Sequence, residues 1–159
     1  MKNTFTCTFF GHRDFNAHFE TEKMLEDIIR NIINENEFTE FLVGMNGEFD
    51  RFVSSVIRRL KKNTGCQNAY HILVLPYASA EFENNKNYYL DFYDEVEYCQ
   101  ESANSHFKSA IGKRNYYMIN RADLVICFVH KKGGAFSAME YAIKSSKPII
   151  NLYRNQITF

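Results

Sequence analysis

Apolar positions along the chain change their period several times, and each change predicts a new element. Residues 4–9 are rich in β-branched and aromatic side chains and run into a glycine, which predicts a strand and its loop. Between residues 19 and 36 apolar side chains return every three or four positions, as on one face of a helix. A short strand at 40–43 and a helix at 48–63, which Gly65 ends, repeat this pair of elements.

The second half of the chain repeats the same alternation. Unbroken apolar runs at 71–76 and 123–129 predict strands that are buried on both faces. Helical spacing predicts helices at 107–120 and 135–145, and a last strand is expected at 148–152.

The stretch 77–105 interrupts the alternation. It is polar, aromatic and acidic with weak periodicity, and we expect one helical turn in it, near 94–99. Long segments without regular structure are uncommon in compact domains unless they are functional or disordered. We therefore expect an insertion that flanks the active site.

The order β-α-β-α-β-insertion-α-β-α-β predicts an α/β fold. We expect a Rossmann-like three-layer sandwich with a mostly parallel sheet of about five strands and helices on both faces. The strand order 3-2-1-4-5 is favoured over 2-1-3-4-5. With 159 residues, of which 45% are hydrophobic, residues 1–159 suffice for a single domain with its own core.

The net charge and the cysteine positions limit which partners and cofactors are expected. Nineteen basic and nineteen acidic side chains give a formal net charge of zero, so neither duplex nucleic acid nor a membrane is expected as a partner. The four cysteines are far apart in the sequence, and we expect no disulfide, no metal and no other cofactor. The chain opens on a strand pattern without a visible signal peptide, which favours the cytoplasm.

The candidate site lies where the predicted strands end. In a doubly wound sheet ligands bind outside the carboxyl ends of the strands, where the strand order reverses. The loops at 11–14 and 130–134 flank that crevice, and the loop at 44–50 lies beside the first of them. The predicted ligand-binding residues come from these loops and the helix that follows: Gly11, His12, Arg13, Gly44, Asn46, Asp50, Lys132, Gly133, Gly134, Ser137 and Glu140.

The pair Gly133-Gly134 just before a helix is suited to a phosphate. Glycines let backbone N–H groups approach the ligand, and the helix N-terminus adds partial positive charge. Lys132 stands next to the pair, and the Ser137 hydroxyl follows one turn later. A glycine pair at this position also occurs as an ordinary turn, and Ser137 as an ordinary residue of a first helical turn, so both interpretations stay open.

For several polar side chains on the other loops and helices, a ligand-binding interpretation stands beside a structural one. Arg13 can hold a phosphate or carboxylate with two hydrogen bonds, or form a solvated ion pair with an acidic neighbour. His12 can hydrogen-bond a sugar or a base. Glu140 can reach a ribose hydroxyl or an anomeric carbon, or face solvent. Asp50 can contact a sugar, although acidic residues in a first helical turn are also favoured by the helix dipole.

Three segments together resemble the SLOG superfamily, the Rossmann-like group that contains the DprA DNA-processing proteins and the LOG phosphoribohydrolases. The segment FTCTFFGHRDF resembles the opening of small bacterial and phage members, and GMNGEFDRFV resembles their second-loop motif. The segment RNYYMINRADLVICFVHKKGGAFSAMEYAIKSSKPIINL resembles the closing stretch with the paired glycines.

The resemblance implies a nucleotide or nucleotide-derived ligand. LOG members cleave the N-glycosidic bond of nucleoside monophosphates, and by this likeness Arg114 and Glu140 fall at their catalytic arginine and glutamate. Lys132, Phe136 and Ser137 depart from the LOG proline, glycine and threonine. The resemblance and the aromatic composition together favour a homodimer or a higher homo-oligomer.

Three hypotheses follow. The first is a module that binds a nucleotide or nucleotide-derived small molecule. The second is an N-glycosidase of the LOG or deoxyribosyltransferase kind that acts on nucleoside monophosphates. The third is an interaction protein whose insertion docks a partner through four aromatic residues: Tyr88, Tyr89, Phe92 and Tyr93.

Overall fold

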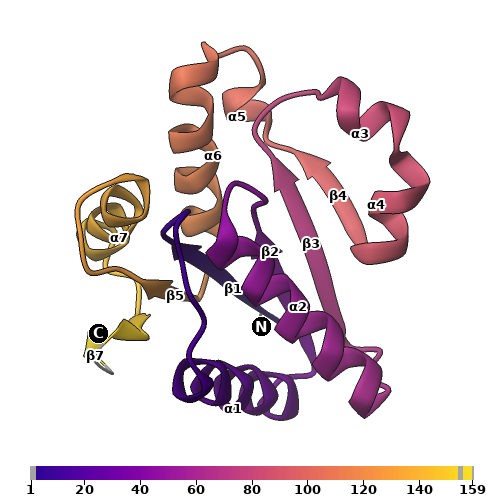
Figure 1. The fold of residues 1–159 in the computed structure, drawn as a ribbon, viewed down its shortest axis with the longest axis vertical. Helices are drawn as coiled ribbons and strands as arrows, with labels where there is room; N and C mark the ends of the chain where they lie inside the picture. Colours follow the sequence, from indigo (N-terminus) through magenta and orange to yellow (C-terminus); the bar gives the residue numbers. More distant parts are fainter. Residues whose placement is uncertain (1–2, 154–155, 159) are drawn as a thin grey trace.

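A seven-stranded sheet in the order β4-β3-β2-β1-β5-β6-β7 forms the centre of the protein (Figure 1). The computed structural model describes residues 3–153 and 156–158. Neighbouring strands are parallel except β6 and β7, which pair antiparallel. The strands are β1 Thr4–Gly11, β2 Phe38–Val43, β3 Ala69–Leu75, β4 Glu95–Tyr98, β5 Leu124–Phe128, β6 Ile149–Asn151 and β7 Gln156–Thr158.

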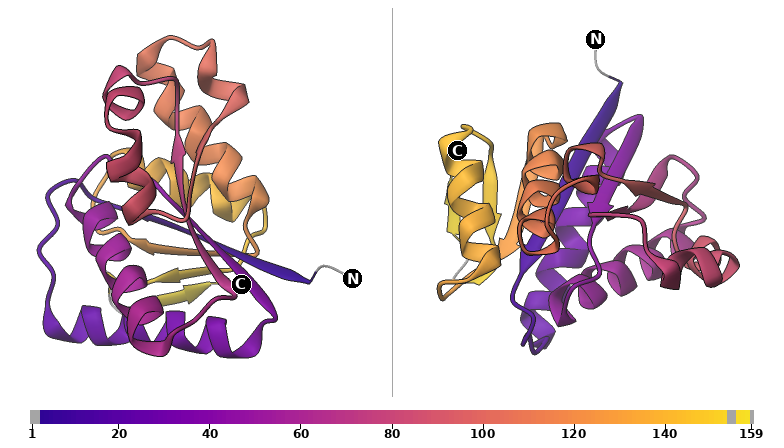
Figure 2. Two further views of the ribbon diagram at one scale, coloured as in Figure 1. Left: turned by 90° about the vertical axis from the view of Figure 1, so that its right-hand side faces the viewer. Right: turned by 90° about the horizontal axis from the view of Figure 1, so that it is seen from above.

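Helices cover both faces of the sheet (Figure 2). They are α1 Phe19–Glu35, α2 Glu48–Thr64, α3 Ala80–Asn84, α4 Lys86–Phe92, α5 Gln100–Ala103, α6 Phe107–Arg121 and α7 Gly134–Lys144. On β1, Phe9 belongs to the core beneath α1 and α2, whereas the next residue, Phe10, belongs to the core beneath α6 and α7. This alternation follows from the two-residue period of a strand and produces the three layers.

The predicted fold class is therefore confirmed. Strands β3-β2-β1-β5-β6 reproduce the favoured order 3-2-1-4-5, and the sheet is extended by one strand at each edge. At residues 94–99 the prediction of a helical turn is wrong. Residues 95–98 form β4, which pairs with β3 and turns Val96 and Tyr98 toward the core.

The insertion contains α3, α4, β4 and α5 and extends the sheet beyond β3. Figure 1 shows α3 and α4 at the opposite side of the molecule from α7. Helix α5, at the end of the insertion, packs against α6. The expectation that the insertion flanks an active site stays a prediction.

Helix α2 shows how the sequence sets the ends of an element. Glu48 and Asp50 occupy its first turn and Lys61 and Lys62 its last, in agreement with the helix dipole. Gly65 then adopts the left-handed conformation with a φ of 62°, and its N–H donates to the carbonyl of Lys61. A residue with a Cβ is strained in this conformation, so the glycine ends the helix.

The carboxyl end of β1 packs tightly on the first turn of α2. A Cβ placed on Gly11 would lie 2.1 Å from Cγ of Phe49, which is fully buried. We expect Gly11→Ala to lower the free energy of unfolding by about 1–3 kcal/mol, because the added methyl group overpacks the core. Urea denaturation measures this, and Gly112→Ala is the matched control, since a Cβ at Gly112 meets nothing within 4 Å. An equal effect of the two substitutions would contradict the prediction.

Within the described ranges, no helix is both long and apolar enough to cross a membrane. The same residues contain no cluster of three or more His, Cys, Asp or Glu side chains that could hold a metal ion.

Candidate functional site

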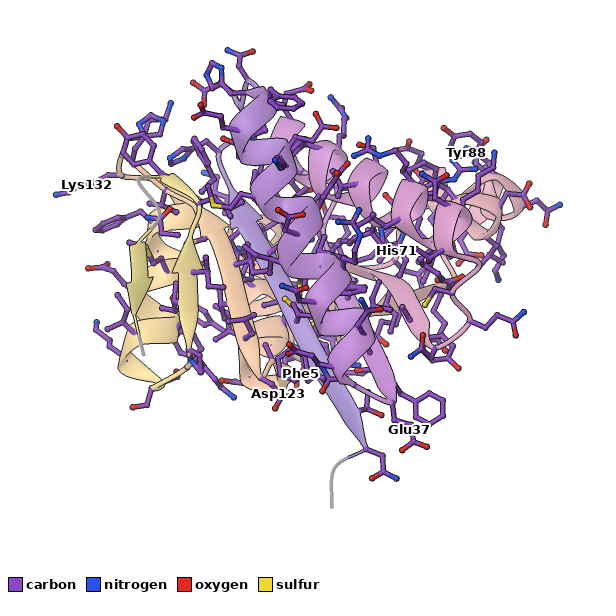
Figure 3. The ribbon with its side chains drawn as sticks, turned by 90° about the horizontal axis from the view of Figure 1, so that it is seen from below. Phe5, Glu37, His71, Tyr88, Asp123 and Lys132 are labelled. Atoms are coloured by element: carbon purple, nitrogen blue, oxygen red, sulfur yellow. The ribbon has the colours of Figure 1, made fainter. Side chains whose placement is uncertain are left out.

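A cavity of about 280 Å³ opens at the carboxyl ends of β1, β2 and β5. In Figure 3, Lys132 lies at this end of the molecule, whereas Phe5, Glu37 and Asp123 lie near the opposite end of the sheet. The cavity floor comes from α6, and its rim comes from the loops that follow the three strands.

The structure brings most of the predicted residues together in this cavity. Its lining includes ten of them: Gly11, His12, Arg13, Gly44, Asn46, Asp50, Arg114, Lys132, Gly133 and Gly134. The lining also has an apolar floor that is absent from the predicted site, and Ile111 and Met118 contribute to it. These two lie seven residues apart with Arg114 and Asn115 between them, which is the spacing of one helix face. The shared helix face is the feature of the sequence that could have predicted this floor.

Ser137 and Glu140 are not among the lining residues, and both are exposed to solvent. Their position follows from the face that α7 buries, which is formed by Ala135, Ala138 and Ala142. Successive helical residues are rotated by about 100°, so Glu140 points away from Ala138 and Ala142 alike. Ser137 and Glu140 therefore do not line this cavity, and their contact with a ligand stays a prediction.

Arg114 forms a buried part of the floor and is only 3% exposed. Its Nη1 donates to the carbonyl of Val74 at 3.1 Å, and its Nε and Nη2 donate to Oδ1 of Asn115 at 3.2 and 2.9 Å. With the amide of Asn46 turned so that its oxygen faces the guanidinium, that oxygen accepts from Nη2 at 2.9 Å. These bonds hold the guanidinium rigidly beneath the cavity.

Asp50 lies beside Arg114 at the start of α2. A Cβ on Gly44 would meet Oδ2 of Asp50 and Nη1 of Arg114, each at 3.0 Å, so a larger residue here would require the two groups to shift slightly. Burial raises the pKa of Asp50, while the N–H of Asn46 and the charges of Arg114 and Arg13 act in the opposite direction. Oδ2 accepts the Asn46 N–H at 2.9 Å.

His12 is buried between the loops after β1 and β5. Its Nε2 accepts the backbone N–H of His130 at 3.1 Å, so Nδ1 carries the proton of the neutral ring. Burial lowers the pKa of His12, and the neighbouring His130 and Lys131 lower it further. The ring is therefore neutral at neutral pH, and it links the two loops.

The N-terminus of α7 opens on the same cavity. Gly133 has a φ of 150°, a conformation that side chains rarely allow, and a Cβ added to Gly133 or to Gly134 would meet no atom within 4 Å. The first N–H groups of a helix have no acceptor within the helix. Here they lie at the cavity rim and supply donors and partial positive charge.

Three cationic side chains stand around this opening. Lys131 is held by Asp14, with Nζ to Oδ2 at 2.7 Å. Arg13 and Lys132 are exposed, and among the described residues neither side chain forms an ion pair. The predicted solvated pair of Arg13 with an acidic neighbour is therefore not formed within those residues. Two cations and a helix N-terminus can together hold a phosphate.

Comparison with protein-family models and with curated protein sequences gives no match. Among solved structures, the chain is similar to DNA processing protein A from Helicobacter pylori, which is described as having a unique single-stranded DNA binding mode. The TM-score is 0.61 at 16% sequence identity, over 92% of this chain and 64% of that chain. The chain thus spans less than two thirds of the length of this neighbour. At this identity the match shows a shared fold.

This neighbour corrects the expectation about partners. That expectation named duplex nucleic acid and rested on the zero net charge of the whole chain. A protein of the same fold binds single-stranded DNA, so the charge balance is no ground for setting nucleic acid aside. The physical reason is that a few local groups at one edge of a sheet can contact phosphates while distant acidic residues balance the total.

Proposed function

We propose that the cavity binds a nucleotide unit, with its phosphate at the N-terminus of α7 and its sugar over the floor. The observation that carries the proposal is the convergence of Arg13, Lys132 and Gly133-Gly134 on one hollow from loops about 120 residues apart. A free nucleotide and a unit of a single strand share this phosphate and sugar chemistry. The resemblance to the SLOG superfamily and the DNA-binding neighbour support the same proposal.

Binding is favoured over glycosidic cleavage. The glutamate that the LOG likeness implies, Glu140, is exposed on the far face of α7. The guanidinium of Arg114 is occupied by Val74 and Asn115, which suits a group that shapes the floor. Asp50 is a partly buried carboxylate at the cavity, and the charges of Arg114 and Arg13 act on it, which suits a contact with a sugar hydroxyl.

The cationic side chains provide the test. We expect Arg13→Ala and Lys132→Ala each to weaken binding of thymidine 5′-monophosphate about tenfold or more, because each removes a charge-assisted hydrogen bond. Isothermal titration calorimetry measures this, with Lys62→Ala as control, since Lys62 is exposed in the last turn of α2. A parallel titration with 5′-phosphorylated oligothymidylate distinguishes a free nucleotide from a strand.

Absence of binding for both ligands, or equal affinities in Arg13→Ala, Lys132→Ala and Lys62→Ala, would overturn the proposal. Release of free thymine from the monophosphate would instead support the glycosidase hypothesis.

A further inference from the structure

A second cavity of about 450 Å³ adjoins the first, on the side of the sheet covered by α1. His12 and Asp14 line both cavities, so the two meet at the loop after β1. The rest of the second lining comes from the start of α1 and from the ends of β5 and β6. No role in the proposed function uses this space.

Aromatic rings form the inner wall of the second cavity. Phe128 contacts Phe15, His130 and Tyr153, with ring centroids 4.9, 5.9 and 5.6 Å apart. His130 in turn lies 4.7 Å from His12 and 4.9 Å from Tyr153. The rings thus continue from the boundary of the first cavity to the end of β6.

A buried amide fixes the position of this wall. Asn151 is 7% exposed, and its Oδ1 accepts the N–H groups of Val129 and Tyr153, each at 3.1 Å. Its Nδ2 donates to the carbonyl of Val129 at 3.0 Å. Because the Asn151 side chain binds the backbones of both Val129 and Tyr153, it holds Tyr153 beside the end of β5.

The chemistry of the lining does not favour a phosphate inside this cavity and fits a flat aromatic group. None of the described residues that line this cavity is a lysine or an arginine, and Asp14 and Glu20 place carboxylates there. Aromatic and histidine rings stack on nucleobases, and Asn16 and Glu20 offer acceptors and donors for the edge of a base. The volume lies within the range of small-molecule sites.

We infer that this second cavity takes a nucleobase joined to the nucleotide in the first cavity, so that the ligand is at least a dinucleotide. The inference rests on the proposed function of the first cavity. The linking sugar-phosphate passes His12, whose ring orientation is fixed by the N–H of His130. The first cavity then supplies the phosphate contacts, and the second supplies stacking.

The test compares three ligands by isothermal titration calorimetry: thymidine 5′-monophosphate, the 5′-phosphorylated dithymidine dinucleotide pdTpdT, and the same dinucleotide with an abasic second unit. We expect the intact dinucleotide to bind about tenfold tighter than the monophosphate, and the abasic form to lose that gain. Tyr153→Ala and His130→Ala should each reduce the gain, and Tyr153→Ala, which is remote from the first cavity, should leave monophosphate affinity unchanged. Tyr116→Ala removes an exposed ring that lines neither cavity, and it should change nothing.

The outcomes separate the two proposals. Equal affinity for monophosphate and dinucleotide overturns the inference and leaves the proposed function standing. No binding of any ligand overturns both. A dinucleotide gain that survives in both Tyr153→Ala and His130→Ala, with thermal unfolding showing that these variants are folded, places the second base elsewhere and also overturns the inference.

Discussion

Replacing Arg114 with methionine should lower the free energy of unfolding by about 2–5 kcal/mol, because each buried acceptor that is left without its donor costs about 1–3 kcal/mol. The substitution leaves the carbonyl of Val74 and Oδ1 of Asn115 without their donors. It also removes a positive charge that lowers the pKa of Asp50, so the carboxylate becomes harder to keep ionised. Urea denaturation at pH 7 measures the loss.

An exposed arginine supplies the control. Arg30 pairs with Asp27 at 3.2 Å, and the two side chains are 45% and 55% exposed, so Arg30→Met should cost less than about 1 kcal/mol. Adding Asp50→Asn to Arg114→Met should restore part of the loss, because the variant then has no uncompensated carboxylate. A double-mutant cycle with a coupling energy near zero, or equal costs for Arg114→Met and Arg30→Met, would refute this account of the floor.

The order of the central elements was predictable because each carries a strong periodic signal. Helices α1 and α2 span 17 residues each, with apolar side chains on one face, and the sequence predicts their ends to within one residue. β4 has only four residues, and β7 has three. Such short segments contain too few alternations to distinguish a strand from a turn, so their pairing at the sheet edges depends on tertiary contacts.

The loops of the candidate site were predictable from topology, whereas side-chain direction on the helices was not. Gly11 ends β1, and Gly44 and Gly133 come after β2 and β5; the carboxyl ends of these parallel strands must meet at one edge, whatever the detail of packing. Glu140 sits on a helix, where a rotation of about 100° per residue decides which face it occupies. The alanines that turn inward on α7 have small side chains and gave a weak periodic signal, so its exposed face was not recognised.

Lowering the pH from 7 to 4 should destabilise the protein by about 3 kcal/mol through His71 alone. This side chain is 2% exposed on β3, and burial lowers its pKa from 6.5 to about 4. In the unfolded chain His71 therefore binds a proton below about pH 6.5, whereas in the folded chain it binds one only below about pH 4. The stabilising effect of the neutral, buried His71 is present above about pH 6.5 and is lost as the pH falls from about 6.5 to about 4. Urea denaturation across this range measures it.

Several groups from the packed elements bear on this titration. Nε2 of His71 lies 3.0 Å from the Ser54 hydroxyl of α2, and its ring lies 4.7 Å from that of Tyr93. Asp94 raises its pKa, whereas Lys61 and Arg58 lower it. His71→Gln removes the titration, so the difference in unfolding free energy between wild type and variant should shrink by about 3 kcal/mol from pH 7 to pH 4. A difference that stays constant would mean that the ring accepts its proton in the folded state, and that the contact between α2 and the insertion is open to water.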